Sequence, residues 1–356
     1  MSAATLTPSQ LTSQHLSEDL EAAIERDPAA FRMLSGDRPT GALHVGHYFG
    51  SLHNRVRLQS AGVEVLVLIA DYQAMTDRVV QPDLPDIVTG LMADYLAAGI
   101  NPDRATIFAH SQVPQLNQLL LPFLSLVSVA EIGRNPTVKD EVAAAGLAAV
   151  SGLMFAYPVH QAADILFCHA KLVPVGMDQL PHLELTRTIA RRFNERYSPG
   201  APYFPEPDGL LSSAPLLLGL DGHKMSKSRH NTIPLRASAD ETARLLRRAK
   251  TDSERSVSYD PAGRPEVASL LLLTALCLGT TPEAVAAQVG DGGAARLKTV
   301  ATEAVNERFA PVRARRAELA ADPGYLRSVL AAGNERATAI GDETLRAVRR
   351  LMHQRY

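Results

Sequence analysis

The feature that most constrains this chain is a short apolar segment that ends in a glycine-rich loop and is followed directly by a helical pattern, within residues 34–52. Residues 31–35 are mostly apolar and precede Gly36, which predicts a buried parallel strand that ends in a turn. Apolar residues then recur at helical spacing in residues 43–59, so we expect a helix that begins near His44. The unpaired N–H groups and the positive dipole end of such a helix face the loop, where they attract phosphate.

Two histidines mark the first turn of this expected helix. His44 and His47 are three positions apart, which places both imidazoles on one face, and Gly46 between them adds no side chain. Gly36 and Gly41 would let the backbone approach a ligand closely. An isolated H-x-x-H pair, however, is more often two solvated histidines at the start of a helix. The segment needs a second cationic element before it indicates a phosphate site.

That second element is the sequence K-M-S-K-S at residues 224–228. Its lysines, Lys224 and Lys227, are three positions apart in a serine-containing loop that follows G-L-D-G-H, and a short strand at residues 216–218 is expected to lead into it. Residues 197–210 are rich in proline, glycine and acidic side chains, which predicts a loop. The lysine pair predicts a mobile cationic clamp.

Strand and helix patterns alternate along most of the chain before the lysine pair. This alternation predicts right-handed crossovers and an α/β fold with a Rossmann-like parallel sheet. In such sheets ligands bind beyond the carboxyl ends of the strands, and the glycine-rich loop would open there. After residue 234 only helical patterns follow. Further strands are expected at residues 63–70, 104–110 and 171–175, and helices at residues 82–98, 114–127, 152–168, 238–250, 266–278, 282–289, 294–321 and 324–352, with another that ends near residue 197.

Residues 152–168 are apolar except for a few polar side chains. Tyr157, Gln161 and Asp164 stand at positions i, i+4 and i+7, so a helix would place them on one face. An unpaired buried carboxylate is costly, and Asp164 therefore needs a partner. We expect these three polar groups to converge from a mostly buried helix.

Two polar segments flank this expected helix. Residues 176–183, G-M-D-Q-L-P-H-L, place Asp178 and Gln179 at a strand-to-helix turn on the same edge of the sheet as the glycine-rich loop. An ordinary N-cap would explain Asp178 alone, but not the combination. Residues 134–141, R-N-P-T-V-K-D-E, interrupt the apolar pattern, as a charged surface turn would also do.

The pairing of H-V-G-H at residues 44–47 with K-M-S-K-S resembles the two diagnostic motifs of class I aminoacyl-tRNA synthetases. The sequence between them resembles the bacterial type of tryptophanyl-tRNA synthetase, and the resemblance covers residues 32–356. It implies ATP-dependent activation of L-tryptophan to tryptophanyl-adenylate, with Mg²⁺ on the phosphates, and transfer to tRNA(Trp). No general base is required, because the protein mainly positions the reactants and supplies positive charge.

The resemblance also implies a domain organisation. Residues 31–230 would form the Rossmann-like catalytic domain, which ends in the K-M-S-K-S loop, and residues 231–356 a helical domain that binds tRNA and its anticodon. Residues 1–30 are expected to form a partly ordered extension without recognisable chemistry. Synthetases of this group are two-fold dimers, so we expect a homodimer, without a membrane, in the cytoplasm.

The site residues follow from the same resemblance, position by position. Catalytic roles are implied for His44, His47, Lys224, Lys227 and Lys139, the last of which would reach ATP from the 134–141 loop. ATP contacts are implied for Arg38, Pro39, Thr40, Gly46, His47, Gly176, Met177, Asp178, Leu217, Lys224, Met225, Ser226, Lys227 and Ser228. Tryptophan contacts are implied for Leu34, Gly36, Tyr157, Gln161, Asp164, Val175 and Gln179, with Asp164 accepting the indole N–H. No protein ligand to a metal is expected.

The choice between tryptophan and tyrosine depends on a few positions. The pattern of Tyr157, Gln161 and Asp164 would also suit tyrosine, because both substrates offer one polar hydrogen on a large ring. Leu34 and the sequences R-N-P-T-V-K-D-E and V-P-V-G-M-D-Q-L-P-H favour tryptophan. The chain departs from the best-known bacterial pattern at Gln161, where many members have methionine, at Gln73, where many have histidine, and at His44, where many have threonine.

Composition narrows the remaining possibilities. The 356 residues suffice for one large domain and a smaller one, and a hydrophobic content of 46% suits a soluble globular enzyme. No apolar run approaches about 20 residues, and no secretory signal is visible. Cys168 and Cys277 are not in metal-ligand spacing, which predicts a reducing compartment and neither a zinc nor an iron–sulfur site.

The charge pattern is compatible with tRNA binding without requiring it. A formal net charge of −2 does not by itself indicate a nucleic-acid-binding protein. Arginine clusters would grip tRNA phosphates if the fold gathers them on one surface, but such clusters are more often solvated helix faces. They occur at residues 191–192, 247–248, 313–316 and 349–350.

Two other functions stay open at this point. A small-molecule nucleotidyltransferase shares the H-x-G-H loop, but would need neither the C-terminal helices nor the complete K-M-S-K-S sequence. An inactive synthetase paralogue that binds tRNA or amino acid for regulation usually loses loop residues. In this chain His44, His47, Lys224 and Lys227 are all present.

Overall fold

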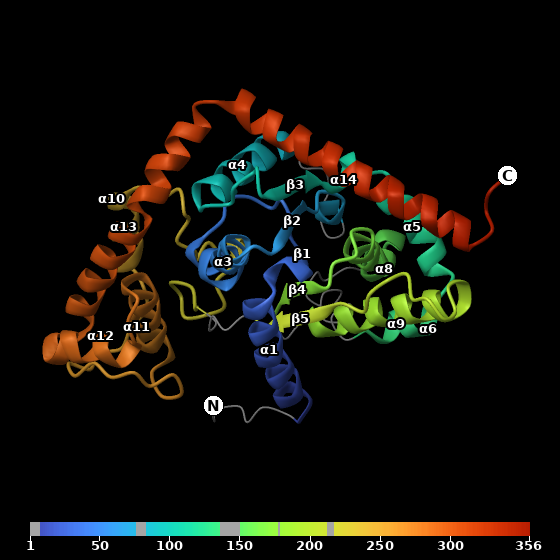
Figure 1. The fold of residues 1–356 in the computed structure, drawn as a ribbon. Coiled ribbons are helices and arrows are strands. Elements are labelled where there is room, and N and C mark those ends of the chain that lie inside the picture. Colours follow the sequence, from blue (N-terminus) through green and yellow to red (C-terminus); the bar gives the residue numbers. More distant parts are fainter. Residues whose placement is uncertain (1–7, 76–82, 136–149, 177–178, 212–216) are drawn as a thin grey trace.

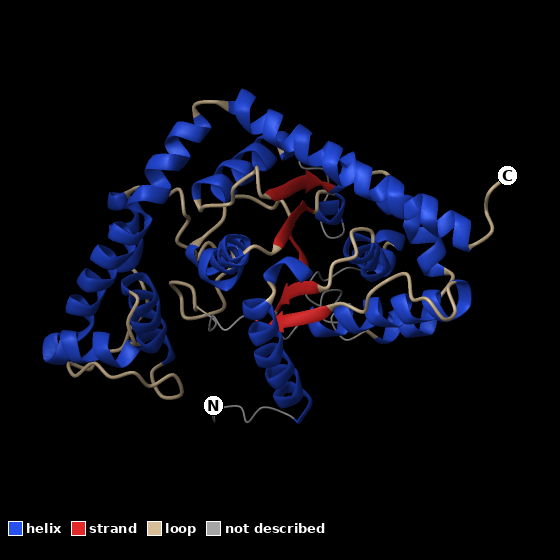
Figure 2. Cartoon of the chain, viewed as in Figure 1, coloured by secondary structure: helices blue, strands red, loops and turns tan. Residues whose placement is uncertain are grey.

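The fold is a parallel sheet that lies between two layers of helices (Figure 1 and Figure 2). The computed structural model describes residues 8–75, 83–135, 150–176, 179–211 and 217–356. The strands lie in the order β3-β2-β1-β4-β5, and each neighbouring pair is parallel, which confirms the predicted α/β class. They are β1 (Arg32–Asp37), β2 (Glu64–Ile69), β3 (Ala105–Ala109), β4 (Leu172–Val175) and β5 (Asp208–Leu211).

The helices follow the alternation expected from the sequence and then continue without strands. Before the K-M-S-K-S loop they are α1 (Pro8–Arg26), α2 (Val45–His47), α3 (His53–Ala61), α4 (Leu84–Ala97), α5 (Gln115–Leu124), α6 (Val129–Arg134), α8 (Gly152–Leu166) and α9 (Leu180–Tyr197). After it they are α10 (Ala239–Arg247), α11 (Pro265–Leu278), α12 (Pro282–Val289), α13 (Gly293–Ala320) and α14 (Pro323–Leu351).

The central strands bury both faces of the sheet, which explains their nearly continuous apolar sequences. In β2, Val65, Val67 and Ile69 belong to one core, which residues of α3, α4, α11 and α13 complete. Leu66 and Leu68 point to the opposite core, which residues of α5, α8 and α9 complete. The order of strands reverses between β1 and β4, so the carboxyl ends of these two strands form the position where open α/β sheets bind ligands.

The N-terminal extension, which was expected to be partly ordered, forms a helix in its described part. Residues 8–26 form α1, and its Leu20 and Ile24 are buried in the core on the side of β5. The Ser17 hydroxyl also accepts a hydrogen bond from the N–H of Leu211 at 3.0 Å. The helix is ordered because it covers the outer edge of the sheet, a reason that the local sequence does not reveal.

The fifth strand lies where a loop was predicted. Residues 208–211 pair with β4 as β5, inside and just beyond the proline-rich segment 197–210. The strand expected at residues 216–218 is not part of the sheet in its described portion, because Leu218 forms an isolated antiparallel bridge with Lys224. β5 itself is short and polar at its start, so its pairing with β4 determines this strand rather than the local sequence propensity.

The predicted helix over residues 43–59 is present, but it is interrupted. After α2 the chain makes a π-helical turn at Tyr48–Leu52 and continues as α3. The Tyr48 ring packs against Phe309 of α13 at 4.9 Å between centroids, and its hydroxyl accepts a hydrogen bond from Arg308 at 3.1 Å. Single π-turns inside helices are frequent at functional sites.

The C-terminal helices form an arm that returns to the sheet. Helix α14 runs along the outer edge of the sheet beside β3 (Figure 1). A Cβ atom on Gly333 would lie 1.8 Å from the Ile107 oxygen, so the helix backbone approaches the strand closely. No single helix in the described parts of the chain is long and apolar enough to cross a membrane, and only the bent pair Pro265–Leu278 and Pro282–Ala320 meets that test by length and composition.

Candidate functional site

The two sequence motifs meet in the fold, as predicted. The N–H of Val45 donates to the oxygen of Ile233 at 3.0 Å, and the N–H of Leu235 donates to the oxygen of Leu43 at 2.9 Å. The Lys227 ammonium donates to the oxygen of Gly41 at 2.7 Å. We call this region, defined by residues 40–47 and 224–235, the loop junction.

Gly46 is required for the close packing of the loop junction. A Cβ atom on this residue would lie 3.0 Å from Nδ1 of His44 and 3.2 Å from the sulfur of Met225. Both distances are shorter than ordinary contacts of a side-chain carbon. Met225 itself is buried, so the middle residue of K-M-S-K-S packs directly on the H-V-G-H turn.

Asn231 holds the K-M-S-K-S loop in shape, a role that the sequence analysis missed. Its side chain accepts the N–H of Ser226 at 2.8 Å and donates to the Lys224 oxygen at 3.2 Å and to Asp221 at 2.6 Å. Asn231 is buried. A buried asparagine a few residues after a lysine pair was the available signal, because such a side chain has to satisfy its hydrogen bonds locally.

His44 and His47 are neutral at physiological pH. Burial lowers the pKa of His44 to about 3, assisted by His47 and Lys227. Burial also lowers the pKa of His47 to about 4, in spite of the nearby Asp37 carboxylate, and Lys227 and Arg55 add to the lowering. The Nδ1 atom of His47 accepts the N–H of His44 at 3.3 Å, which leaves its proton on Nε2. The pair can donate hydrogen bonds to phosphate but cannot supply positive charge.

The buried arginine next to this pair is already neutralised. Arg55 contacts Asp37 at 2.6 Å, and the Tyr95 hydroxyl donates to the same carboxylate oxygen at 2.6 Å. Although burial alone would raise it, the Arg55 charge holds the pKa of Asp37 far below its usual range. The charge of Arg55 is therefore already balanced within the protein by Asp37.

A cavity of about 300 Å³ opens beside the loop junction, at the carboxyl ends of β1 and β4. Side chains from α8 close its other side. Every residue predicted to contact tryptophan lines it. The lining consists of Leu34, Ser35, Gly36, Asp37, Arg38, Leu68, Ala70, Gln73, Tyr157, Gln161, Asp164, Ile165, Val173, Pro174, Val175 and Gln179.

The structure requires glycine at position 36 for a reason that differs from the expected one. A Cβ atom there would lie 2.8 Å from the Leu68 oxygen of β2. The glycine therefore allows β1 and β2 to pair at the cavity wall, whereas the sequence suggested close approach of the backbone to a ligand. Because Gly36 also lines the cavity, close strand pairing and close approach of its backbone to a ligand can both occur.

Tyr157 uses its hydroxyl within the protein. Its oxygen lies 3.0 Å from Nε2 of His182, and Nδ1 of the same histidine lies 3.3 Å from the Asn135 amide. His182 is the histidine of the segment 176–183 described above, and it supports the cavity from α9. The convergence of Tyr157, Gln161 and Asp164 on one cavity confirms the prediction from helical spacing.

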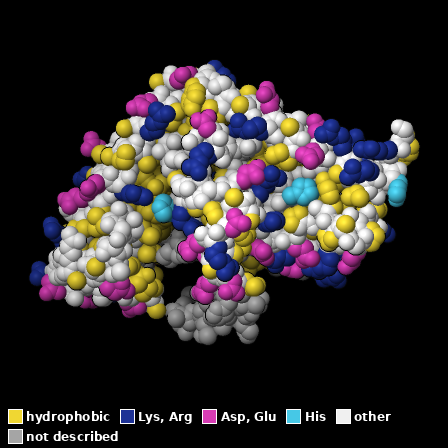
Figure 3. Space-filling model, viewed as in Figure 1, with side chains coloured by type: hydrophobic (Ala, Val, Ile, Leu, Met, Phe, Trp, Pro, Cys, Tyr) yellow, Lys and Arg dark blue, Asp and Glu magenta, His cyan; other side chains and the backbone are white. Residues whose placement is uncertain are grey.

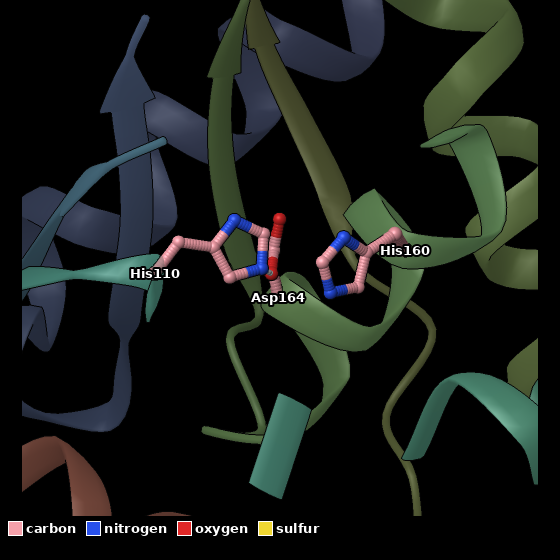
Figure 4. A group of neighbouring side chains, drawn as sticks. All are labelled: His110, His160 and Asp164. Atoms are coloured by element: carbon pink, nitrogen blue, oxygen red, sulfur yellow. Dashed lines mark ion pairs between the residues drawn. The ribbon is translucent and has the colours of Figure 1, made fainter. Parts of the chain in front are cut away.

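Asp164 has a protein partner that the sequence analysis did not identify. One of its carboxylate oxygens lies 2.8 Å from Nε2 of His110, which follows β3 (Figure 4). The buried carboxylate therefore has an ion-pair partner, although neither of its oxygens accepts a well-formed hydrogen bond from the described residues. The signal in the sequence was a histidine at the carboxyl end of a predicted parallel strand, where site residues gather.

Some predicted ATP contacts cannot be placed. Lys139, Met177 and Asp178 lie outside the described residues, as does the side chain of Ser228. Leu217 is buried in the core with 5% of its surface exposed, and Lys224 is exposed. Thr40 lies at the loop junction, 3.4 Å from the Lys227 ammonium.

Comparison with known proteins is consistent with this geometry. The family model described as tRNA synthetases class I (W and Y) matches residues 26–310. A tryptophan–tRNA ligase from Treponema pallidum (strain Nichols) is 40% identical over 332 residues, which cover 90% of this chain and 96% of that protein. One from Lactococcus lactis subsp. lactis (strain IL1403) is 39% identical over 339 residues, covering 91% of this chain and 98% of that protein.

Solved structures show the same relation. The tryptophanyl-tRNA synthetase from Campylobacter jejuni, complexed with ADP and tryptophan, superposes with a TM-score of 0.78 at 29% identity, covering 90% of this chain and 99% of that chain. A tyrosyl-tRNA synthetase from Archaeoglobus fulgidus, complexed with L-tyrosine, has a TM-score of 0.66 at 21% identity, covering 86% of this chain and 99% of that chain. The latter likeness concerns the fold alone.

Proposed function

The chain belongs to the family of class I tRNA synthetases for tryptophan and tyrosine, and from this premise we propose how its loop junction and cavity divide one reaction. The chain activates tryptophan with ATP and charges tRNA with it. The tryptophan carboxylate attacks the α-phosphorus of ATP and pyrophosphate leaves, which gives tryptophanyl-adenylate. A terminal hydroxyl of tRNA then takes the tryptophanyl group and AMP leaves. The observation that carries this function is the direct contact of H-V-G-H with K-M-S-K-S beside the cavity.

We propose that ATP binds at the loop junction. Arg38, Pro39 and Thr40 would frame the triphosphate, and Gly46 would lie under the adenosine. The neutral imidazoles of His44 and His47 would donate hydrogen bonds to the phosphates or ribose, which fits their lowered pKa values. Further ATP contacts in this proposal are Gly176, Met177, Asp178, Leu217, Met225, Ser226 and Ser228, with Lys139 approaching from its own loop.

The two lysines would supply the charge that the transition state needs. Lys227 lies on the Gly41 oxygen and would exchange this contact for the leaving pyrophosphate. Lys224 is exposed at the start of the same loop and would close over the phosphates with it. Charge delivered mainly in the transition state raises turnover more than it strengthens ground-state binding.

Mg²⁺ is proposed to bind through ATP rather than through protein carboxylates. The two carboxylates that line the cavity are already engaged, Asp37 with Arg55 and Asp164 with His110. The phosphate oxygens of the nucleotide are the ligands that Mg²⁺ usually keeps in such sites. There the ion would neutralise charge on the departing pyrophosphate.

The cavity is proposed to hold the tryptophan side chain. Leu34, Val175 and the backbone at Gly36 would contact the ring. Tyr157, Gln161 and Gln179 would contact the other polar groups of the amino acid. Asp164 would accept the indole N–H. A buried acceptor left without this hydrogen would lose about 1–3 kcal/mol of binding, which disfavours rings that lack one.

We propose that tRNA binds across the C-terminal helices, although fewer arginines are available than the sequence suggested. Arg192 pairs with Glu131, and Arg316 pairs with Asp94, so both support the fold. The exposed Arg247, Arg248 and Arg350 remain candidates for phosphate contacts. A contact of this kind is expected to weaken with salt.

A two-fold dimer in the cytoplasm completes the proposal. Leu121 on α5 and Val129 on α6 are 72% and 74% exposed, and large apolar side chains at the surface are typical of interaction sites. The cytoplasm is where ATP, tRNA and the ribosome meet. Sedimentation of the purified chain would test the dimer, since a monomer at micromolar concentration would contradict it.

The test of the function is amino-acid-dependent exchange of pyrophosphate into ATP, measured with each of the twenty amino acids. We expect tryptophan alone to stimulate exchange strongly, with transfer to tRNA(Trp) in a second assay. Stimulation by tyrosine and not tryptophan would reverse the specificity, since a tyrosine ring offers a comparable polar hydrogen. An absence of exchange with any amino acid, together with binding of tRNA, would favour an inactive regulatory paralogue.

A further inference from the structure

Three buried side chains behind the cavity wall form a group that the proposed reaction uses only in part (Figure 4). His110 follows β3, while His160 and Asp164 lie one turn apart on α8. Their exposed fractions are 0%, 3% and 1%. Of the three, only Asp164 is part of the cavity lining.

The composition of this group would suit a metal ion, but its geometry favours an ion pair. One ligand atom from each side chain lies within 4.8 Å of the others. The His110 and His160 rings, however, are stacked at 4.1 Å with an angle of 21° between their planes, and Nε2 of His110 is in direct contact with Asp164 at 2.8 Å. Stacked, nearly parallel imidazoles do not direct two lone pairs to one tetrahedral centre.

The surroundings of His110 favour its charged form. It faces Asp164 and His160 on α8, and Asp71 and Tyr72 on the segment after β2. Burial lowers the pKa of His110, but the Asp164 carboxylate, assisted by Asp71, more than compensates, and the pKa is raised. Burial lowers the pKa of the stacked His160, so the positive charge of the two rings lies on His110.

We propose that His110 is a positioning residue for the amino-acid substrate: its ion pair with Asp164 holds this carboxylate turned toward the cavity, so that it accepts the ring N–H of tryptophan. This role rests on the proposed function, in which the Asp164 carboxylate accepts the indole N–H, and it adds that His110 holds this carboxylate in place. A carboxylic acid can present either a donor or an acceptor to the cavity, whereas a carboxylate presents only acceptors. His110 therefore favours rings that donate a hydrogen over rings that have none.

The loss of His110 has a specific chemical consequence. Removal of His110 takes away the cation that lies 2.8 Å from the buried Asp164 carboxylate, and a buried charge that loses its partner is costly. The carboxylate would then be held less well for the indole N–H. As the pH rises through the raised pKa of His110, wild type loses the same cation, so the difference in tryptophan binding between wild type and such a variant should narrow in alkaline solution.

The experiment compares His110→Ala, His110→Gln and His160→Phe in the full chain by tryptophan-dependent pyrophosphate exchange. Wild-type exchange is measured first, because its absence would refute the proposed function rather than this inference. For His110→Ala we expect the KM for tryptophan to rise roughly 5- to 100-fold with little change in the KM for ATP. The ratio of its tryptophan KM to that of wild type should shrink as the pH rises from about 6.5 to 8.5.

The two other variants separate positioning from structure. His110→Gln keeps a donor of similar reach, and we expect it to recover a large part of the lost affinity. His160→Phe keeps the ring stack but cannot titrate, and its tryptophan KM should stay within about twofold of wild type. Thermal unfolding of each variant verifies that the chain folds.

Other outcomes would overturn the proposal. A tryptophan KM ratio for His110→Ala that stays constant with pH would mean that His110 is merely structural. Equal losses in His160→Phe and His110→Ala, with stoichiometric zinc in wild type that both variants lose, would instead identify a metal site. A folded His110→Ala protein with wild-type KM would remove the role altogether.

Discussion

Histidine has opposite protonation behaviour in the two halves of the site. At the loop junction, burial near Lys227 lowers the pKa of His44 to about 3 and that of His47 to about 4. Behind the cavity, His110 is just as buried, yet the Asp164 carboxylate raises its pKa. Burial favours the neutral form of all three rings, and only at His110 does a neighbouring carboxylate outweigh it. In the proposed reaction, lysine would therefore supply the positive charge at the loop junction and histidine the hydrogen bonds, whereas His110 would act as a cation beside the cavity.

The comparison is tested most strongly at Lys227. Because the neighbouring histidines are neutral, its replacement removes charge that they cannot replace. We expect Lys227→Ala to lower the kcat of pyrophosphate exchange by about 10²- to 10³-fold, with a much smaller change in the KM for tryptophan. Lys224→Ala is the matched control in the same loop, with a smaller loss expected from its exposed side chain. If kcat and tryptophan affinity fall equally, the lysine does not act in the transition state.

A second test concerns the support of the loop junction from outside. Asp94 is buried, accepts the N–H of Leu43 at 3.0 Å, and pairs with Arg316 of α13 at 2.6 Å. Arg316→Ala leaves this carboxylate without its cation, and we expect the free energy of unfolding to fall by about 3 kcal/mol. Arg315→Ala removes only an exposed pair with Glu318 and should change it by less than about 1 kcal/mol. Urea unfolding that gives equal losses for both variants would contradict the assignment.

A third test uses acid to examine the loop junction. Below pH 6.5 the unfolded chain protonates His47, whereas the folded chain resists protonation down to about pH 4. Stability should therefore fall as the pH drops through this window, by up to about 1.4 kcal/mol per pH unit for this residue. His47→Gln should reduce the slope of unfolding free energy against pH between these limits. An unchanged slope would show that His47 is not held neutral.

The last and smallest effect is that of His110 on the free energy of unfolding above pH 6.5. The raised pKa of His110 gives stability that is fully present below the unfolded value of 6.5 and is lost as the pH rises through the folded value. His110→Gln should flatten the stability curve above pH 6.5 and leave the acid slope unchanged. If His47→Gln and His110→Gln change the slope of unfolding free energy against pH in the same pH range, the two histidines do not differ in protonation as described.

The sequence predicted best what local backbone chemistry determines. The strand, loop and helix start around Gly36, Gly41 and Gly46 follow from glycine and apolar spacing, and the convergence of Tyr157, Gln161 and Asp164 follows from helical periodicity. The C-terminal helices were likewise predicted closely, since their apolar and capping patterns are strong. These signals lie within a few residues of one another.

The pairs that hold the site together were not predictable in the same way. His110 with Asp164, Tyr157 with His182, and Asp94 with Arg316 join residues on different elements, and a single sequence contains no record of which side chains meet. The same holds for β5, which exists because β4 offers it backbone partners. The charge of the histidines is another case, since it depends on what surrounds them after folding.

The close approach of α14 to β3 has a consequence for synthesis of the protein. The Asn334 side chain accepts the N–H of Ala109, and Arg336 donates to the Ala105 oxygen, so the outer edge of the sheet is covered by a helix near the end of the chain. A nascent polypeptide that already contains both motifs still exposes an open strand edge, which invites pairing with another chain. We expect the open edge of β3 to favour aggregation until α14 has left the ribosome, and chains that are terminated before α14 to precipitate although they contain both motifs.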